Sequence, residues 1–155
     1  MTLETLVVVR HGQYDYGLTK IGRGQIQNLA EQLSRLVAGK RIAIVSSSEL
    51  RARETAQIIR EMLGVDSIEE DSILYSSCLS TVDLDELVLL VDKKTESHEV
   101  LVLSAHLEVV EFLPQEYCKR KGLPIPILRR PPQKGSARVI NVLTGAQELL
   151  VGKLN

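Results

Sequence analysis

Four side chains that could bind phosphate or act as nucleophiles stand just beyond apolar runs of strand length. These side chains are Arg10, His11, Arg51 and His106. The preceding apolar runs are Thr5–Val9, Ile42–Val45 and Val100–Leu103. In open α/β sheets, ligands bind beyond the carboxyl ends of the strands. The spacing therefore predicts that the four side chains meet at one edge of a sheet.

Two arginines and two histidines with no carboxylate among them form a cationic pocket. Arginine presents a planar fork of donors that matches phosphate oxygens two at a time, and histidine can be a nucleophile, a proton donor or an anion contact. Either residue type alone after a strand is more often structural than functional. Together they would repel one another in an empty site, and phosphate would relieve that repulsion. Arg51 is expected in the first turn of a helix, a place that favours anions, so an anion shared with the helix amides would offset its charge there.

The hydrophobic pattern alternates between strands and amphipathic helices, and predicts a three-layer α/β sandwich. Further strands are expected at Ile73–Tyr75, Val139–Val142 and Glu148–Val151. Helices are expected over Lys20–Val37, from Ser46–Ser48 to about Leu63, from the Ser80/Asp83 capping box through Val91, and from about Leu107. This order predicts a mostly parallel central sheet closed by an antiparallel edge hairpin. No boundary divides the chain, so residues 1–155 are expected to form a single domain.

Composition excludes several other classes of protein. The chain has 155 residues, a net charge of −1 and 3% aromatic residues, which argues against a nucleic-acid binder. No apolar run approaches the ~18 residues of a membrane helix, and the first residues lack a secretory leader, so no membrane partner is expected. The two cysteines, Cys78 and Cys118, lack metal-ligand spacing and are expected to be reduced thiols in a cytoplasmic protein.

Four motifs in order resemble those of the histidine phosphatase superfamily, which includes the phosphoglycerate mutases. The motifs are Arg10-His11-Gly12 after three valines, Leu18-Thr19 with Gly22 and Gln25, Ser47 or Ser48 with Leu50-Arg51-Ala52 and Thr55-Ala56, and Ser104-Ala105-His106. An Arg-His-Gly triplet alone would be a weak signal. The ordered set, together with the later strand pair, implies a phosphoglycerate mutase-like fold.

The resemblance implies roles for individual residues. His11 would be the nucleophile and would carry a transient phosphoryl group, which water then releases. Arg10, Arg51 and His106 would hold the phosphoryl oxygens, and Ser48 is assigned as a further phosphate contact. Phosphoryl transfer depends mainly on positioning and charge complementarity, which agrees with this set. No metal or other cofactor is implied.

A general acid, which many members place between the second arginine and the second histidine, has no matching motif here. Asp71 and Glu70 are the nearest candidates, although exposed loop charges are the more ordinary interpretation. The interval is short and lacks the insertions that form a lid in the mutases. The chain therefore resembles the short SixA-type phosphohistidine phosphatases, because a phosphoramidate leaving group can take its proton from solvent.

Three functions remain open at this stage. The first is a phosphatase acting on protein phosphohistidine or another open phosphorylated substrate. The second is a small-molecule phosphomonoester phosphatase, which would require one of the carboxylates. The third is a non-catalytic phosphate-binding or scaffold domain. The proline-rich segment Leu113–Gly135 carries Arg129, Arg130 and Lys134 among its basic residues and is expected to be a solvated connector. The alternative is a basic rim that steers an acidic phosphoprotein or adds a second phosphate contact.

Overall fold

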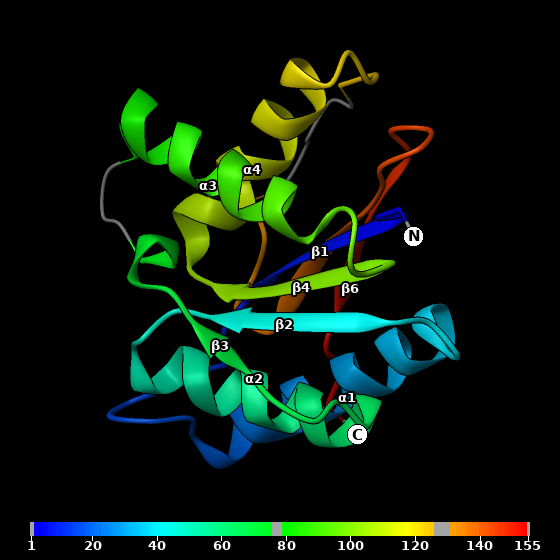
Figure 1. Cartoon of the computed structure of the whole chain (residues 1–155). Coiled ribbons are helices and arrows are strands. Elements are labelled where there is room, and N and C mark those ends of the chain that lie inside the picture. Colours follow the sequence, from blue (N-terminus) through cyan, green and yellow to red (C-terminus); the bar gives the residue numbers. More distant parts are fainter. Residues whose placement is uncertain (1, 76–78, 126–130, 155) are drawn as a thin grey trace.

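The fold is centred on one six-stranded sheet, seen in a computed structural model that describes residues 2–75, 79–125 and 131–154 (Figure 1). The strands are β1 Thr5–Arg10, β2 Ile42–Ser46, β3 Glu69–Glu70, β4 Val100–Ala105, β5 Ser136–Asn141 and β6 Gln147–Val151. Their order across the sheet is β3-β2-β4-β1-β5-β6. The first four are parallel, β5 runs antiparallel to β1, and β6 runs antiparallel to β5. The predicted edge hairpin is confirmed.

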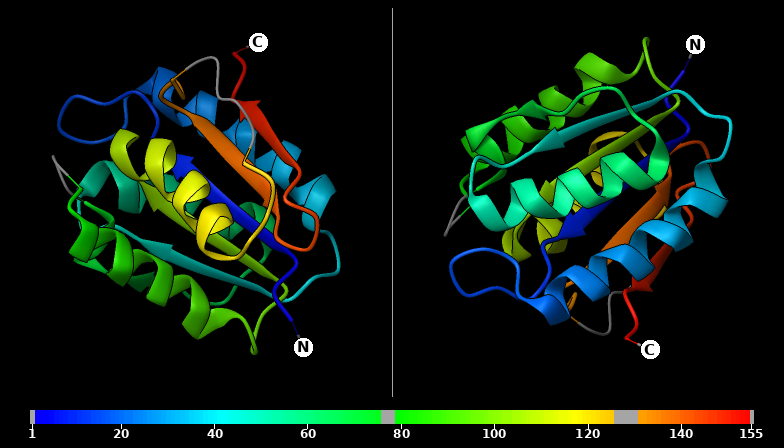
Figure 2. Two further views of the ribbon diagram at one scale, coloured as in Figure 1. Left: turned by 90° about the horizontal axis from the view of Figure 1, so that it is seen from above. Right: turned by 90° about the horizontal axis from the view of Figure 1, so that it is seen from below.

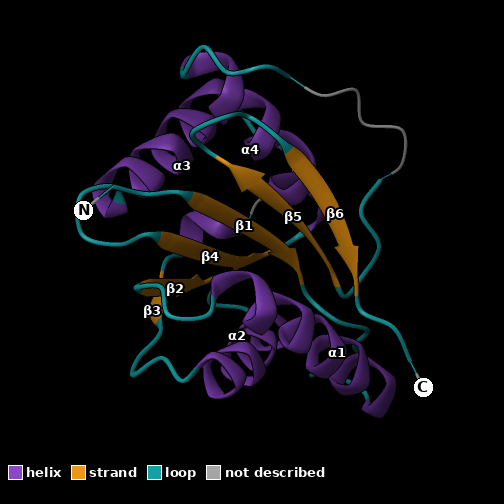
Figure 3. Ribbon diagram, turned by 90° about the vertical axis from the view of Figure 1, so that its right-hand side faces the viewer, coloured by secondary structure: helices purple, strands orange, loops and turns teal. Residues whose placement is uncertain are grey.

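Four α-helices cover the two faces of this sheet (Figures 2 and 3). The helices are α1 Lys20–Val37, α2 Leu50–Leu63, α3 Thr81–Lys94 and α4 Leu107–Arg120. Because side chains alternate along each strand, every central strand contributes residues to the helix layers on both faces of the sheet. In β1, Val7 and Val9 pack with the α1 and α2 side, and Leu6 and Val8 pack with the α3 and α4 side. The three-layer sandwich predicted from the sequence is confirmed.

The helix ends follow local sequence signals. Thr19 accepts a hydrogen bond from the Gly22 amide at the start of α1. Gly64 ends α2 in the left-handed conformation that glycine adopts most easily. Ser80 and Asp83 form the predicted capping box of α3. None of the helices in the described ranges combines the length and apolar character needed to cross a membrane.

Two sequence predictions about local structure are wrong. Ile73–Tyr75 is not a strand, because Ser72–Leu74 forms a 3₁₀ turn that Asp71 caps through the Ile73 amide. The strand of this region is the short β3. The first part of the predicted connector Leu113–Gly135 is helical, since α4 continues through Pro114 to Arg120. Arg129 and Arg130 lie outside the described residues, and so does Cys78.

The topology leaves a crevice beyond the carboxyl ends of β1 and β4. These strands are neighbours, with Arg10 opposite Ala105 in the register. The chain leaves β1 toward α1 on one face and leaves β4 toward α4 on the other. Such a switch point is where open α/β sheets bind their ligands.

Candidate active site

The four predicted residues meet in one pocket at this switch point. Arg10 and His11 come from the end of β1, Arg51 from the first turn of α2, and His106 from the residue after β4. The pocket has a volume of about 210 Å³. The centroids of the two imidazole rings lie 5.1 Å apart. The expectation that distant segments converge is therefore correct.

The hydrogen bonds of His11 assign its tautomer. Its Nδ1 lies 2.9 Å from the carbonyl oxygen of Gly12, which can only accept, so Nδ1 carries the proton. Its Nε2 then has a free lone pair, which accepts a hydrogen bond from Nε of Arg51 at 3.3 Å. The ring is 4% exposed. His11 is thus held with its nucleophilic nitrogen turned toward a cation.

His106 is assigned by the same reasoning. Its Nδ1 lies 3.5 Å from Nη2 of Arg51, which can only donate. The proton of the neutral ring is therefore on Nε2, which lies 2.9 Å from the hydroxyl oxygen of Ser47. Arg51 thus donates to one lone pair on each histidine. Ser47 holds the far side of the second ring.

Arg10 is the second arginine that lines the pocket. Its Nη1 donates to the carbonyl oxygen of Pro132 at 2.8 Å, which ties the loop before β5 to the end of β1. The Gly135 amide reinforces this junction by donating to the carbonyls of Arg10 and His11. Nε of Arg10 is buried and has no hydrogen-bond partner among the described residues. A buried donor of this kind is costly unless an acceptor is supplied.

Burial and positive charge keep both histidines neutral. Desolvation is the main cause that lowers the pKa of His11 to about 4, and Arg51, Arg10 and Lys134 lower it further, although the bond to Gly12 opposes them. Desolvation likewise lowers the pKa of His106 to about 3, with contributions from His11 and both arginines. At neutral pH the His11 lone pair is therefore available for attack.

Tyr14, Tyr75 and Glu108 line the pocket but were not candidates from the sequence, and Lys134, from the basic proline-rich segment, lines it as well. Tyr14 stacks on Arg51, whose Cζ lies 4.5 Å from the ring centroid. The Nζ of Lys134 lies 5.3 Å from the same centroid. Glu108 lies in the first turn of α4, two residues after His106. The only sequence signal for Tyr14 and Glu108 was their closeness to His11 and His106.

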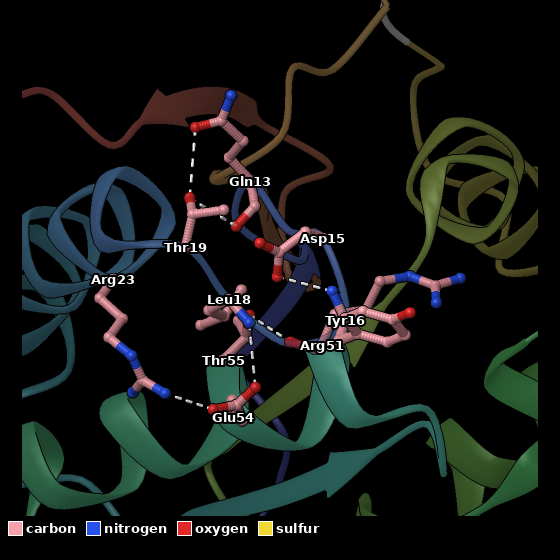
Figure 4. A network of polar contacts seen from close by, with 9 residues as sticks. All are labelled: Gln13, Asp15, Tyr16, Leu18, Thr19, Arg23, Arg51, Glu54 and Thr55. Atoms are coloured by element: carbon pink, nitrogen blue, oxygen red, sulfur yellow. Dashed lines mark hydrogen bonds and ion pairs between the residues drawn. The ribbon is translucent and has the colours of Figure 1, made fainter.

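The loop that carries Tyr14 is fastened to α2 (Figure 4). Glu54 accepts a hydrogen bond from the Leu18 amide at 3.0 Å and forms an ion pair with Arg23. Tyr14 in turn forms an isolated β-bridge with Leu18. Glu54 and Arg51 lie about one turn apart on α2. One helix therefore positions both the guanidinium and the ring that stacks on it.

Three other predicted residues are not brought to the pocket. Ser48 is exposed and does not line it, whereas the neighbouring Ser47 contacts His106. Glu70 lies in β3, exposed, 3.8 Å from Nη1 of Arg53. Asp71 caps the 3₁₀ turn. The carboxylate at the pocket is instead Glu108.

A larger cavity, of about 360 Å³, lies at the opposite end of the sheet, beside the start of β2. Its walls are charged, but the main charges are paired there. Lys40 binds Glu4 at 2.8 Å, and Glu69 binds Lys94 at 2.8 Å. Among the described residues, no group of three or more His, Cys, Asp or Glu side chains could hold a metal ion. The chemistry is concentrated at the switch point.

Comparisons with known proteins agree with this geometry. Residues 4–74 match the family model described as histidine phosphatase superfamily (branch 1), which confirms the resemblance inferred from the motifs. No curated protein sequence gives a match.

Solved structures share the fold at low sequence identity. A mycobacterial glucosyl-3-phosphoglycerate phosphatase, in complex with inorganic phosphate, has 20% identity and a TM-score of 0.67, covering 98% of this chain and 97% of that one. A phosphoglycerate mutase from Plasmodium falciparum has 20% identity and a TM-score of 0.62, covering 100% and 96%. A protein assigned as phosphohistidine phosphatase SixA from Agrobacterium tumefaciens has 14% identity and a TM-score of 0.62, covering 89% and 91%. These likenesses confirm the phosphoglycerate mutase-like fold.

Proposed function

We propose, from the match of residues 4–74 to the histidine phosphatase superfamily, that this protein is a phosphatase that works through a phosphohistidine intermediate on His11. The observation that carries the proposal is the unprotonated Nε2 of His11, which faces Arg51 in a pocket that also holds Arg10 and His106. A neutral nucleophile surrounded by fixed positive charges is suited to bind and attack a phosphoryl group.

The reaction has two steps. In the first, the Nε2 lone pair attacks phosphorus, the bond to the leaving group breaks, and its electron pair goes to the leaving atom, which takes a proton from solvent. His11 keeps its Nδ1 proton on the Gly12 carbonyl and is transiently cationic. In the second, water attacks the phosphorus, the P–N bond breaks, and its electron pair returns to Nε2. Inorganic phosphate leaves, and the water proton passes to phosphate or solvent.

The phosphoryl oxygens have donors ready for them. Arg51 would exchange its hydrogen bonds to the two imidazoles for bonds to oxygen, and the unpaired Nε of Arg10 would gain an acceptor. Two cations then offset the charge that builds up in the transition state. His106 keeps its Nε2 proton on the Ser47 hydroxyl, so this contact fixes the ring beside the bound phosphoryl group.

Protein phosphohistidine is the substrate we favour, because neither predicted acid lies at the pocket. A P–N bond needs less help from a protein acid than an ester bond, since its nitrogen can be protonated from water. A pocket of about 210 Å³ is small for a large metabolite, but it accepts a phosphorylated side chain that extends from another protein. Much faster cleavage of sugar phosphates than of protein phosphohistidine would contradict this preference.

The direct test is to incubate the protein with radiolabelled phosphoramidate and look for an acid-labile protein adduct. Wild type should form the adduct and turn over, whereas His11→Ala should do neither. His98→Ala is the matched control, because His98 lies at the other end of the sheet and should leave both signals intact. Binding of phosphate without any adduct would favour a non-catalytic scaffold and overturn the proposal.

A second candidate, a phosphomonoester phosphatase for small molecules, is favoured by the position of Glu108 at the pocket. An alkoxide leaving group requires a proton donor within reach, and Glu108 is the one carboxylate lining the pocket among the described residues. Glu108→Gln distinguishes the two. An ester phosphatase should lose at least about 10²-fold in kcat on esters, whereas a phosphohistidine phosphatase should lose much less on N-phosphoryl substrates.

A further inference from the structure

Two tyrosines flank Arg51 and each contacts one of the two histidines. The Tyr14 centroid lies 4.5 Å from Cζ of Arg51 and 5.0 Å from the His11 centroid. The Tyr75 centroid lies 5.7 Å from the same Cζ and 4.6 Å from the His106 centroid. Both rings meet their histidine edge-on, with interplanar angles of 84° and 70°. The phosphate-binding groups are therefore bordered by aromatic rings on two sides.

The two rings reach the pocket from separate segments and are held differently. Tyr14 is half-buried in the loop that Glu54 fastens to α2, so its position relative to Arg51 is fixed. Tyr75 follows the 3₁₀ turn, is 46% exposed and still lines the pocket. One ring thus lies in a loop fastened to α2, and the other is partly exposed to solvent. A ligand that projects out of the pocket on this side meets an aromatic ring.

The hydrogen-bonding capacity of the residues around the scissile bond indicates which leaving group the pocket favours. The strongest donors in the pocket, Arg10 and Arg51, are occupied by phosphoryl oxygens in the proposed reaction. Aromatic faces and edges offer a sugar or polyol few hydrogen bonds, but they form edge-to-face or offset contacts with another ring. Arg51 can also stack on a flat π-system. The surroundings of the scissile bond therefore suit a planar ring.

We propose that Tyr14 and Tyr75 form an aromatic slot that selects substrates whose phosphoryl group is carried on a planar aromatic ring, with imidazole as the preferred ring. The inference rests on the proposed function, because the slot acts on the group that His11 releases. For a phosphorylated imidazole, the P–N bond breaks as the P–Nε2 bond to His11 forms. The electron pair stays on the departing ring nitrogen, the other ring nitrogen carries a proton taken from solvent, and neutral imidazole leaves past the tyrosine rings.

The test compares leaving groups within each variant. The substrates are N-phosphoimidazole, phenyl phosphate and phosphoramidate, of which the last has the same P–N chemistry without a ring. The measured quantity is the ratio of kcat/KM for N-phosphoimidazole to that for phosphoramidate. A loss of Arg51 positioning affects both substrates, so this ratio isolates the contact with the ring.

Wild type should favour N-phosphoimidazole, and Tyr14→Leu or Tyr75→Leu should each lower the ratio about tenfold, mainly through KM. Tyr14→Phe and Tyr75→Phe keep the ring and should keep the ratio. Tyr16→Leu is the matched control, because Tyr16 lies in the same loop, is 95% exposed and does not line the pocket. Phenyl phosphate should respond to the leucine variants in the same direction but with a lower kcat/KM than the imidazole substrate.

The outcomes separate this inference from the proposed function. If phosphoramidate is cleaved through His11 but the leucine variants leave the ratio unchanged, the slot is refuted and the phosphatase stands. If phenyl phosphate is the better substrate, the preference for imidazole is refuted. If neither P–N substrate is cleaved, the proposed function itself fails.

Discussion

Nε of Arg51 lies 3.3 Å from Nε2 of His11, so the phosphate-binding arginine donates to the lone pair that we propose attacks phosphorus. This hydrogen bond joins the proposed nucleophile directly to a residue that binds the phosphoryl group. It keeps the imidazole oriented while the pocket is empty and disfavours its protonation. An incoming phosphoryl oxygen is a better acceptor for guanidinium than imidazole nitrogen is, so the substrate would release the lone pair as it binds.

Replacing Arg51 should leave the phosphate-free protein at least as stable as wild type and abolish its stabilisation by phosphate. Arg51→Met removes one of the positive charges that cluster near Arg10 and Lys134, so the Tm without phosphate should stay level or rise. Wild type should gain Tm on addition of inorganic phosphate, and the variant should not. Its kcat/KM should fall at least about 10²-fold. Thermal denaturation with and without phosphate measures the first two effects.

Arg53→Met provides the control, because Arg53 is on the same helix but is exposed and beside Glu70. It should respond to phosphate as wild type does. Phosphate that stabilises Arg51→Met as strongly as wild type would contradict the assignment of Arg51.

The phosphatase activity should persist at pH values well below 6.5. The attacking form of His11 is the neutral one, and the pKa of His11 is lowered to about 4. The acid limb of kcat/KM should therefore lie near pH 4 rather than near 6.5. Lys134→Met removes a charge that lowers this pKa and should move the limb to higher pH. Lys153→Met, beyond the last strand, should leave it in place. A wild-type limb near pH 6.5 would show that the ring is not held neutral.

The same shift makes folding sensitive to acid. The pKa of His11 in the folded protein, about 4, is below its ordinary value of 6.5, so the unfolded chain binds a proton first as pH falls. Stability should be fully present above pH 6.5 and should fall between pH 6.5 and 4 by about 1.4 kcal/mol per pH unit for each such proton. Urea unfolding across this range measures the slope. His11→Gln should have a smaller slope than wild type, and an equal slope would refute the assignment.

Alanine substitutions at the adjacent residues Ser47 and Ser48 should differ in their effects on kcat and on stability. Ser47 is buried and holds Nε2 of His106 at 2.9 Å, so Ser47→Ala should lower kcat about tenfold and destabilise the fold by about 1 kcal/mol. Ser48 is exposed, so Ser48→Ala should change neither quantity measurably. Steady-state kinetics and chemical denaturation of the two variants check both statements. A larger effect at Ser48 would restore the role that the sequence suggested for it.

Most of the layered fold could be predicted from the sequence, because hydrophobic periodicity reports burial directly. Val7 and Val8 face opposite layers, as a continuous apolar strand requires. Arg10, His11, Arg51 and His106 could be predicted because each is next to a strand end or a helix start. Ile73–Tyr75 misled the prediction because three apolar residues fit a strand and a 3₁₀ turn equally well.

The rest of the site depends on contacts that sequence spacing does not encode. Tyr75 and Lys134 reach the pocket from loops whose paths are set by tertiary packing. The choice between Ser47 and Ser48 depends on which hydroxyl points inward after β2, and a one-residue shift reverses that direction. Glu70 and Asp71 were candidates because of their place in the chain, but β3 and the turn cap hold them elsewhere.

The most direct measurement is the position of the phosphoryl group on the trapped intermediate, read by phosphorus–nitrogen correlated NMR on protein labelled with ¹⁵N-histidine. The geometry predicts a single adduct on Nε2 of His11, with Nδ1 still protonated and bonded to the Gly12 carbonyl. A phosphoryl group on Nδ1 of His11, on His106 or on no histidine at all would contradict the account.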